Sequence, residues 1–153
     1  MQEHIQNELA SFIANCDWEK IAPHFKEDAA YRVLDWVGCA VAGEHYPQVE
    51  IAQKYFIENG DQGNSTVIGH QIKCSPRTAA FLNGIAGHVC ELDDGHRTAI
   101  GHPGSIAVPT ALALGEHLNA SGADVLKAVI LGYEVFSRLG RTVNPSHYRT
   151  WHT

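Results

Sequence analysis

Charged side chains and long hydrophobic runs are both scarce in this sequence. Of its 153 residues, 18% are charged and 44% are hydrophobic, a composition that excludes a disordered chain and a membrane protein. No stretch of about 18 consecutive apolar residues is present, so we expect no transmembrane helix. Residues Met1–His4 contain no basic segment and lead into no long apolar run, so no signal peptide is predicted and the cytoplasm is the expected location.

Basic residues and paired cysteines are scarce as well. With 11 Lys and Arg against 17 Asp and Glu, the formal net charge is -6, and the sequence has no basic stripe of the kind that binds nucleic acid. None of the four cysteines forms a C-x-x-C pair, and their spacing matches no zinc pattern. We therefore expect reduced thiols in a cytosolic protein.

Hydrophobic residues recur at helical spacing through most of the chain. Proline and serine start signals and glycine stop signals divide this pattern into helices. The predicted helices cover residues 5–14, 23–43, 47–59, 76–87, 105–118 and 121–143. Pro109 should kink the fifth helix or mark its true start. Residues 65–69 could form one short strand, for which no partner is evident.

The pattern as a whole predicts an all-α protein. Its length is that of one ordinary domain, spanning residues 1–153, with no internal repeat or linker. The last residues are rich in aromatic and histidine side chains, whereas chain ends are usually polar. They read as the start of a further structural element.

The chemistry is concentrated in the segment 88–104, between two apolar helices. Its 17 positions hold three histidines, three carboxylates and one arginine: His88, His96, His102, Glu91, Asp93, Asp94 and Arg97. Loops held between rigid helices commonly carry functional groups.

Three interpretations of this segment are open. Its charges could simply be solvated, with Asp93 or Asp94 accepting backbone amides. They could form a metal site from Glu91, Asp93, His96 and His102, although the spacing matches no known ligand pattern. They could also perform acid–base catalysis on an anionic substrate, in which a histidine moves the proton and Arg97 holds a carboxylate.

Several separate motifs in this sequence resemble those of one enzyme family. They are 34–43 (LDWVGCAVAG), 80–88 (AFLNGIAGH), 91–96 (ELDDGH), 102–104 (HPG), 132–135 (GYEV), 138–140 (RLG), 145–148 (PSHY) and 151–153 (WHT). Together they are similar to the MmgE/PrpD family, which includes 2-methylcitrate dehydratase, cis-aconitate decarboxylase and iminodisuccinate epimerase. The resemblance covers essentially the whole chain.

The resemblance implies a large, bundle-like helical domain with a smaller α/β lid, a homodimer, and no metal or organic cofactor. It implies a lyase or isomerase that removes a proton α to a carboxylate of a small di- or tricarboxylate. Because chains of this family are much longer, we expect this one to be the N-terminal part of the helical domain without the lid, inert by itself or completed by a C-terminal part. The alternative is a non-catalytic helical assembly subunit or an inactive truncated product.

The resemblance also implies roles for individual residues. His102 and His152 match catalytic histidines, and the Glu91–Asp94 cluster would orient them, so Glu91 and Asp94 are included among the catalytic residues. The predicted substrate-binding residues are Arg97, His96, Asp93, His147 and Tyr148. Two positions depart from the family pattern, because Glu91 stands where several members have aspartate and Gly95 where many have threonine. His88 is read as an ordinary helix residue.

Overall fold

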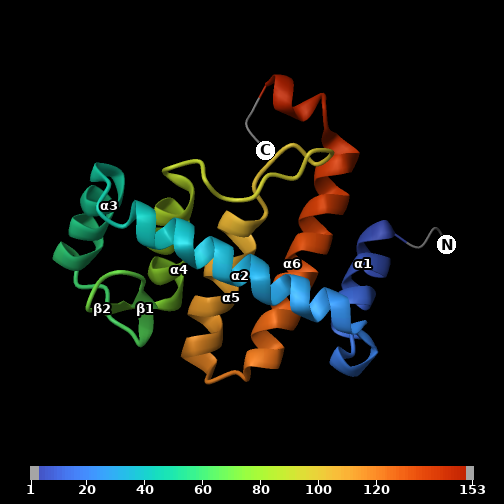
Figure 1. The fold of residues 1–153 in the computed structure, drawn as a ribbon, viewed down its shortest axis with the longest axis horizontal. Helices are drawn as coiled ribbons and strands as arrows, with labels where there is room; N and C mark the ends of the chain where they lie inside the picture. The colour runs from blue at the N-terminus through green and yellow to red at the C-terminus, as the bar shows by residue number, and fades with distance from the viewer. Residues whose placement is uncertain (1–3, 151–153) are drawn as a thin grey trace.

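Residues 4–150 form six α-helices and one short β-hairpin, which confirms the predicted all-α class (Figure 1). The computed structural model describes residues 4–150. Its elements are α1 (Ile5–Ala14), the 3-10 helix η1 (Trp18–Lys20), α2 (Pro23–Gly43), α3 (Pro47–Glu58), β1 (Ser65–Val67), β2 (Ile72–Cys74), α4 (Pro76–His88), α5 (Gly104–Leu118), α6 (Gly122–Val143) and the 3-10 helix η2 (His147–Arg149). Among residues 4–150, no helix is both long and apolar enough to cross a membrane.

The predicted start signals form the expected caps. Proline occupies the first turn of α2, α3 and α4, where its missing N–H has no helical partner to lose. The Ser75 hydroxyl accepts the Thr78 N–H at 3.3 Å, and the Ser121 hydroxyl accepts the Asp124 N–H at 3.1 Å. These contacts fix where α4 and α6 begin.

Helix α5 tolerates a proline in its interior. It begins at Gly104 and continues through Pro109, so the prediction that Pro109 marks its true start is wrong. Proline cannot donate to the carbonyl of Ser105, four residues earlier. At this point α4 approaches closely, because a Cβ on Gly84 would lie 3.2 Å from the Ser105 carbonyl oxygen. Proline and glycine together let the two helices pack tightly beside the loop that joins them.

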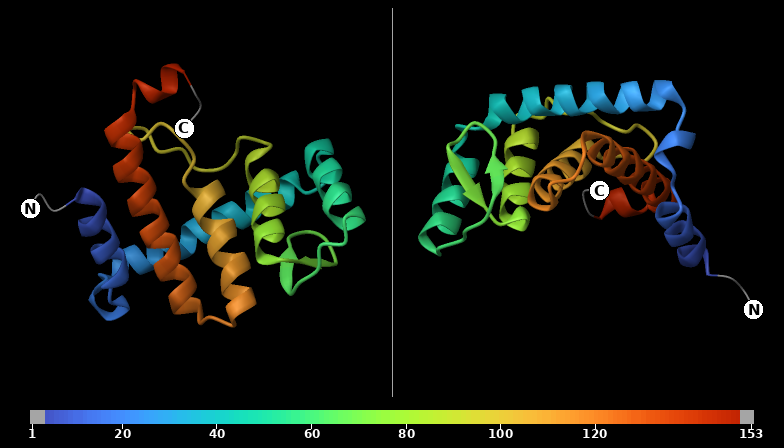
Figure 2. Two further views of the ribbon diagram at one scale, coloured as in Figure 1. Left: turned by 180° about the vertical axis from the view of Figure 1, so that it is seen from behind. Right: turned by 90° about the horizontal axis from the view of Figure 1, so that it is seen from below.

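Helix α2 lies across α4, α5 and α6 and forms one wall of the core (Figures 1 and 2). The largest buried side chain of this core is Trp36 on α2. Its ring fills the space that a side chain at Gly87 of α4 would need, since a Cβ there would lie 2.5 Å from the indole nitrogen. Gly87 therefore sets the close contact of α2 with α4.

The short strand predicted at residues 65–69 has a partner after all. Strand β1 pairs antiparallel with β2, with Ser65 opposite Cys74 and Val67 opposite Ile72. A strand of three residues is too short to show an alternating pattern, so β2 is not recognisable from the sequence. Gly69 turns the chain between the strands with a φ of +80°.

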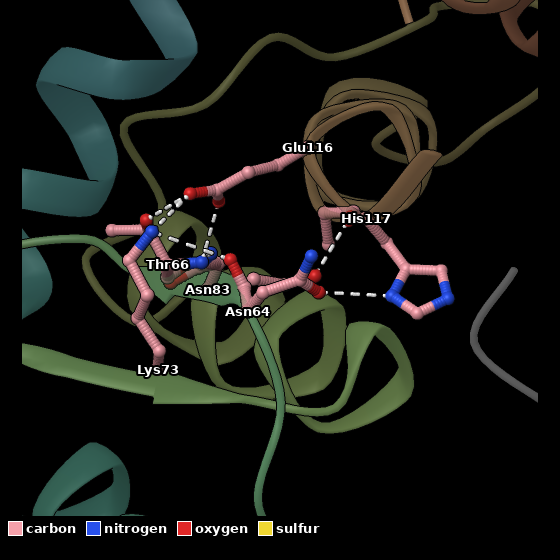
Figure 3. Close-up of polar contacts among 8 residues, drawn as sticks. Asn64, Thr66, Lys73, Asn83, Glu116 and His117 are labelled. Atoms are coloured by element: carbon pink, nitrogen blue, oxygen red, sulfur yellow. Dashed lines mark hydrogen bonds and ion pairs between the residues drawn. The ribbon is translucent and has the colours of Figure 1, made fainter. Parts of the chain in front are cut away.

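The hairpin is held against the helices by polar side chains (Figure 3). The carboxylate of Glu116 on α5 accepts the Thr66 N–H at 2.6 Å and the Thr66 hydroxyl at 2.7 Å, and it pairs with Lys73 at 2.8 Å. Asn83 on α4 accepts the Ile68 N–H at 2.9 Å and donates to the Thr66 carbonyl at 2.9 Å. A two-stranded hairpin is marginal alone, so these contacts stabilise it.

Glu116→Gln should destabilise the chain by about 1 kcal/mol at neutral pH, which lowers Tm by about 3 °C. Partial burial disfavours the Glu116 charge, but the hydrogen bonds from Lys73 and Thr66 outweigh it and lower the pKa of the carboxyl. A lowered folded pKa gives stability that is present at neutral pH and is lost as the pH falls through that pKa. Thermal melts of both proteins between neutral and acid pH measure the difference.

The matched control is Glu58→Gln, which removes an exposed pairing with Lys54 at 3.8 Å. Exposed pairs of this kind contribute little, so its Tm should stay within about 1 °C of the original. A Glu116→Gln difference that does not shrink at acid pH would contradict the role assigned to the charge.

Candidate functional site

The connection from α4 to α5, residues 89–103, is an ordered loop without regular structure, as predicted. Its internal contacts include an isolated bridge between His96 and Gly101. The loop lies against the C-terminal end of α6, where a Cβ on Gly140 would lie 2.6 Å from the Ala99 side chain. Asn144 donates its side-chain amide to the Ala99 carbonyl. The loop is therefore fixed at both its helices and along α6.

Asp93 is the buried centre of this loop, with a side chain that is 0% exposed. Its carboxylate lies 3.0 Å from Nδ1 of His88, at the end of α4, and 3.3 Å from Nδ1 of His102. It also accepts the hydroxyl of Ser105, in the first turn of α5, at 2.6 Å. A buried carboxylate requires such partners, because desolvation is costly. One aspartate thus gathers two imidazoles at the point where α4 and α5 meet.

The two imidazoles open into a groove between α4 and α5. Their ring centroids are 4.7 Å apart with the planes tilted by 60°. The side chains are 38% exposed for His88 and 26% exposed for His102. The groove has a volume of about 550 Å³, and its other lining residues include the apolar side chains Phe81, Ile85 and Ile106. We refer to it as the α4–α5 groove.

Asp94, the next residue, faces a different set of partners. Its carboxylate pairs with Arg32 of α2 at 2.8 Å and accepts the Gly104 N–H, at the start of α5, at 3.1 Å. Burial, the charge of Asp94 and a hydrogen bond to it raise the pKa of the Tyr133 hydroxyl on α6. Asp94 therefore joins α2, α5 and α6 through one carboxylate.

A second and larger hollow lies on this side of the loop. It has a volume of about 1060 Å³ between α2 and α6, and we refer to it as the α2–α6 cleft. Asp94, His96 and Arg97 all line it, whereas His102 lines the α4–α5 groove. The structure thus divides the predicted site residues between two hollows.

Among the other predicted residues that the structure describes, Glu91, His147 and Tyr148 line neither of these hollows. Glu91 is exposed, with a φ of +50°. His147 and Tyr148 are exposed in η2, where the Tyr148 N–H donates to the Asn144 side chain at 3.2 Å. His152 lies outside the described residues. The catalytic and binding roles predicted for all the site residues, those that line the two hollows included, stay predictions.

Several residues of the site were missed or undervalued from the sequence. His88 was read as an ordinary helix residue, although its spacing of five residues from Asp93 and its place at a helix end favour such a contact. Ser105 adjoins the His-Pro-Gly motif and was assigned only to its helix. Arg32 and Tyr133 come from helices distant in the sequence, and no pattern links them to Asp94.

The residue types around Asp93 could also hold a metal ion. His88, Asp93 and His102 each offer one ligand atom, and within residues 4–150 they form the one group whose ligand atoms all lie within 4.8 Å of one another. Imidazole and carboxylate suit zinc, iron or manganese. Of the metal set considered from the sequence, only Asp93 and His102 belong to this group, and Glu91 and His96 do not.

Asp94→Ala should destabilise the chain by about 2–3 kcal/mol, because it leaves the Gly104 N–H and the half-buried Arg32 without this carboxylate. Asp28→Ala is the matched control, since Asp28 also pairs with Arg32, at 2.7 Å, but is 56% exposed. It should cost about 0.5 kcal/mol or less. Urea unfolding of the three proteins measures both losses, and equal losses would contradict the role given to Asp94.

Comparison with known proteins gives consistent matches along this chain. The MmgE/PrpD N-terminal domain matches residues 7–153. The cis-aconitate decarboxylase-like protein oryM of Aspergillus oryzae is 30% identical over 98% of this chain and 33% of its own length. Cis-aconitate decarboxylase of Aspergillus terreus is 31% identical over 97% of this chain and 32% of its own. The human cis-aconitate decarboxylase is 36% identical over 70% of this chain and 23% of its own. The chain thus spans about a third or less of the length of these relatives.

Proposed function

The chain belongs to the MmgE/PrpD family, and on that premise we propose that it supplies the acid–base group of a lyase acting on small di- or tricarboxylates. The family match and the decarboxylase relatives support a lyase of the decarboxylase or dehydratase type. The proposal includes a reaction without metal or organic cofactor, a cytoplasmic location and a polycarboxylate as substrate.

One observation carries the proposal: the buried Asp93 carboxylate lies beside His102 at the rim of a groove. A carboxylate next to one imidazole nitrogen fixes the orientation of the ring and leaves the other nitrogen to move a proton. His102 belongs to the His-Pro-Gly motif and lines the α4–α5 groove. Its role would be to take a proton from, or give one to, the carbon beside a substrate carboxylate.

The α4–α5 groove lacks a basic side chain that could bind a substrate carboxylate, among the residues that the structure describes. The described residues that line the α4–α5 groove include no lysine or arginine. Arg97, proposed to hold a substrate carboxylate, lines the α2–α6 cleft instead. We propose that the groove is completed by basic groups of the region that follows the matching part in the longer relatives.

The alternative function, a helical assembly subunit, is favoured by an apolar hollow on another face. Helices α5 and α6 border a groove of about 660 Å³. Its lining includes the exposed side chains Ile106, Leu114, Leu118 and Leu139. Contiguous apolar surface of this kind drives association.

We expect the 153-residue chain to run as a dimer or larger species in size-exclusion chromatography with light scattering, through this α5–α6 groove. The variant carrying Leu114→Glu and Leu139→Glu should shift toward the monomer, because it places charge on the apolar surface. Glu19→Gln and Glu27→Gln, on other segments, serve as the control. A monomeric unmodified chain at micromolar concentration would contradict the expectation.

The function is tested with the chain alone and joined to the C-terminal two-thirds of the Aspergillus terreus relative, against a panel of di- and tricarboxylates. We expect turnover by the joined protein only. His102→Gln should lower kcat by about 10²-fold or more, the usual effect of losing a general acid or base. His117→Gln, at the far end of α5, should leave kcat within about twofold. Turnover that survives His102→Gln would refute the assignment.

A further inference from the structure

We propose that His88 is a second acid–base imidazole of the α4–α5 groove, held by Asp93 in the same tautomer as His102. This deepens the proposed function, because it names a second proton-carrying group in the same site. The starting point is that two imidazoles turn the same nitrogen, Nδ1, toward one carboxylate, at 3.0 Å and 3.3 Å.

The tautomers follow from the partners. A carboxylate only accepts hydrogen bonds, so an imidazole nitrogen that faces it must carry a proton. Nδ1 of His88 lies almost equally far from both oxygens of Asp93, at 3.0 and 3.1 Å. Nδ1 of His102 lies at an ion-pair distance of 3.3 Å from Oδ2, and Oδ2 accepts the Ser105 hydroxyl at 2.6 Å. In the neutral state His88 is therefore protonated at Nδ1. We infer the same tautomer for His102, because an unprotonated Nδ1 would turn its lone pair toward the Asp93 carboxylate. Nε2 is then the basic nitrogen of each ring.

His96 provides the contrast within the same loop. Its Nδ1 accepts the backbone N–H of Ala99 at 3.0 Å and so carries no proton when the ring is neutral. Its proton must be on Nε2. The loop therefore holds histidines in opposite tautomers, and Asp93 accounts for the difference.

Two basic nitrogens from one groove suit reactions in which one proton leaves the substrate and another arrives. One imidazole takes the proton from carbon, and the bonding electron pair stays on the substrate. The other, as imidazolium, gives its proton to the leaving oxygen or to the carbon. The pair then holds as many protons as before, and the Asp93 carboxylate stabilises whichever ring is charged. Both residues line the groove, which places both within reach of one bound molecule.

The test is two-bond proton–nitrogen correlation NMR on the 153-residue chain with ¹⁵N-labelled histidine, at a pH of about 8, where most histidines are neutral. We expect the Nδ1–H pattern for His88 and His102 and the Nε2–H pattern for His96. Signals are assigned from single His→Gln variants. An Nε2–H pattern for either His88 or His102 would overturn the proposal.

Two further variants test whether Asp93 determines the tautomers of His88 and His102. Asp93→Asn should shift His88 and His102 toward the Nε2–H form, and it should leave His96 unchanged. Glu58→Gln, an exposed acid on α3 outside the site, should change none of the three patterns. If Zn²⁺ moves both Nδ1 resonances to a deprotonated, metal-bound form at one equivalent, the three residues are a metal site and the proposal fails.

The catalytic part has a readout of its own. In the joined protein, His88→Gln should lower kcat by about tenfold or more with a smaller change in KM, since it removes a proton-transfer group. Full activity of His88→Gln beside a large loss in His102→Gln would overturn the role of His88 and leave the proposed function intact. Absence of all turnover would refute the proposed function, while the NMR patterns would still decide the tautomers.

Discussion

The site depends on one constraint, which is that two adjacent aspartates of the α4–α5 loop face opposite ways. Asp93 is buried under His88, His102 and Ser105, while Asp94 pairs with Arg32 and accepts the first N–H of α5. If either carboxylate moved away, buried polar groups would be left without hydrogen-bond partners, at a cost in stability. The backbone between them is thereby fixed, and with it the position of the loop relative to α2, α4 and α5.

Close packing of the helices makes this arrangement possible. His88 ends α4 and Ser105 lies in the first turn of α5, so a single carboxylate reaches both only if the helices approach closely beside the loop. Gly84 allows that approach on one side of α4, and Gly87 admits Trp36 of α2 on another. The dense small residues that the sequence shows in α4 thus have a geometric consequence, since they let α2 and α5 approach α4 closely.

The sequence predicted some of this and could not predict the rest. The helices were found because their starts carry proline or serine and their apolar residues repeat at helical spacing, whereas β2 is too short to show any pattern. The chemistry of residues 88–104 was located from its composition. The different partners of Asp93 and Asp94 could not be predicted from the sequence. Two adjacent aspartates are equivalent in a sequence pattern, and only the folded backbone determines the direction of each side chain. The partners Arg32 and Tyr133 join Asp94 only through the packing of α2 and α6.

The fold requires neither Gly95 nor Glu91, the two residues that depart from the family pattern. A Cβ on Gly95 would meet no atom within 4 Å, and Gly95 is exposed, so packing does not require glycine there. Glu91 is also exposed, so packing in the core does not require a side chain of this length. Packing therefore does not constrain which side chain stands at either position. Because both lie on the loop that carries His102, they can vary while Asp93 and Asp94 hold that loop in place.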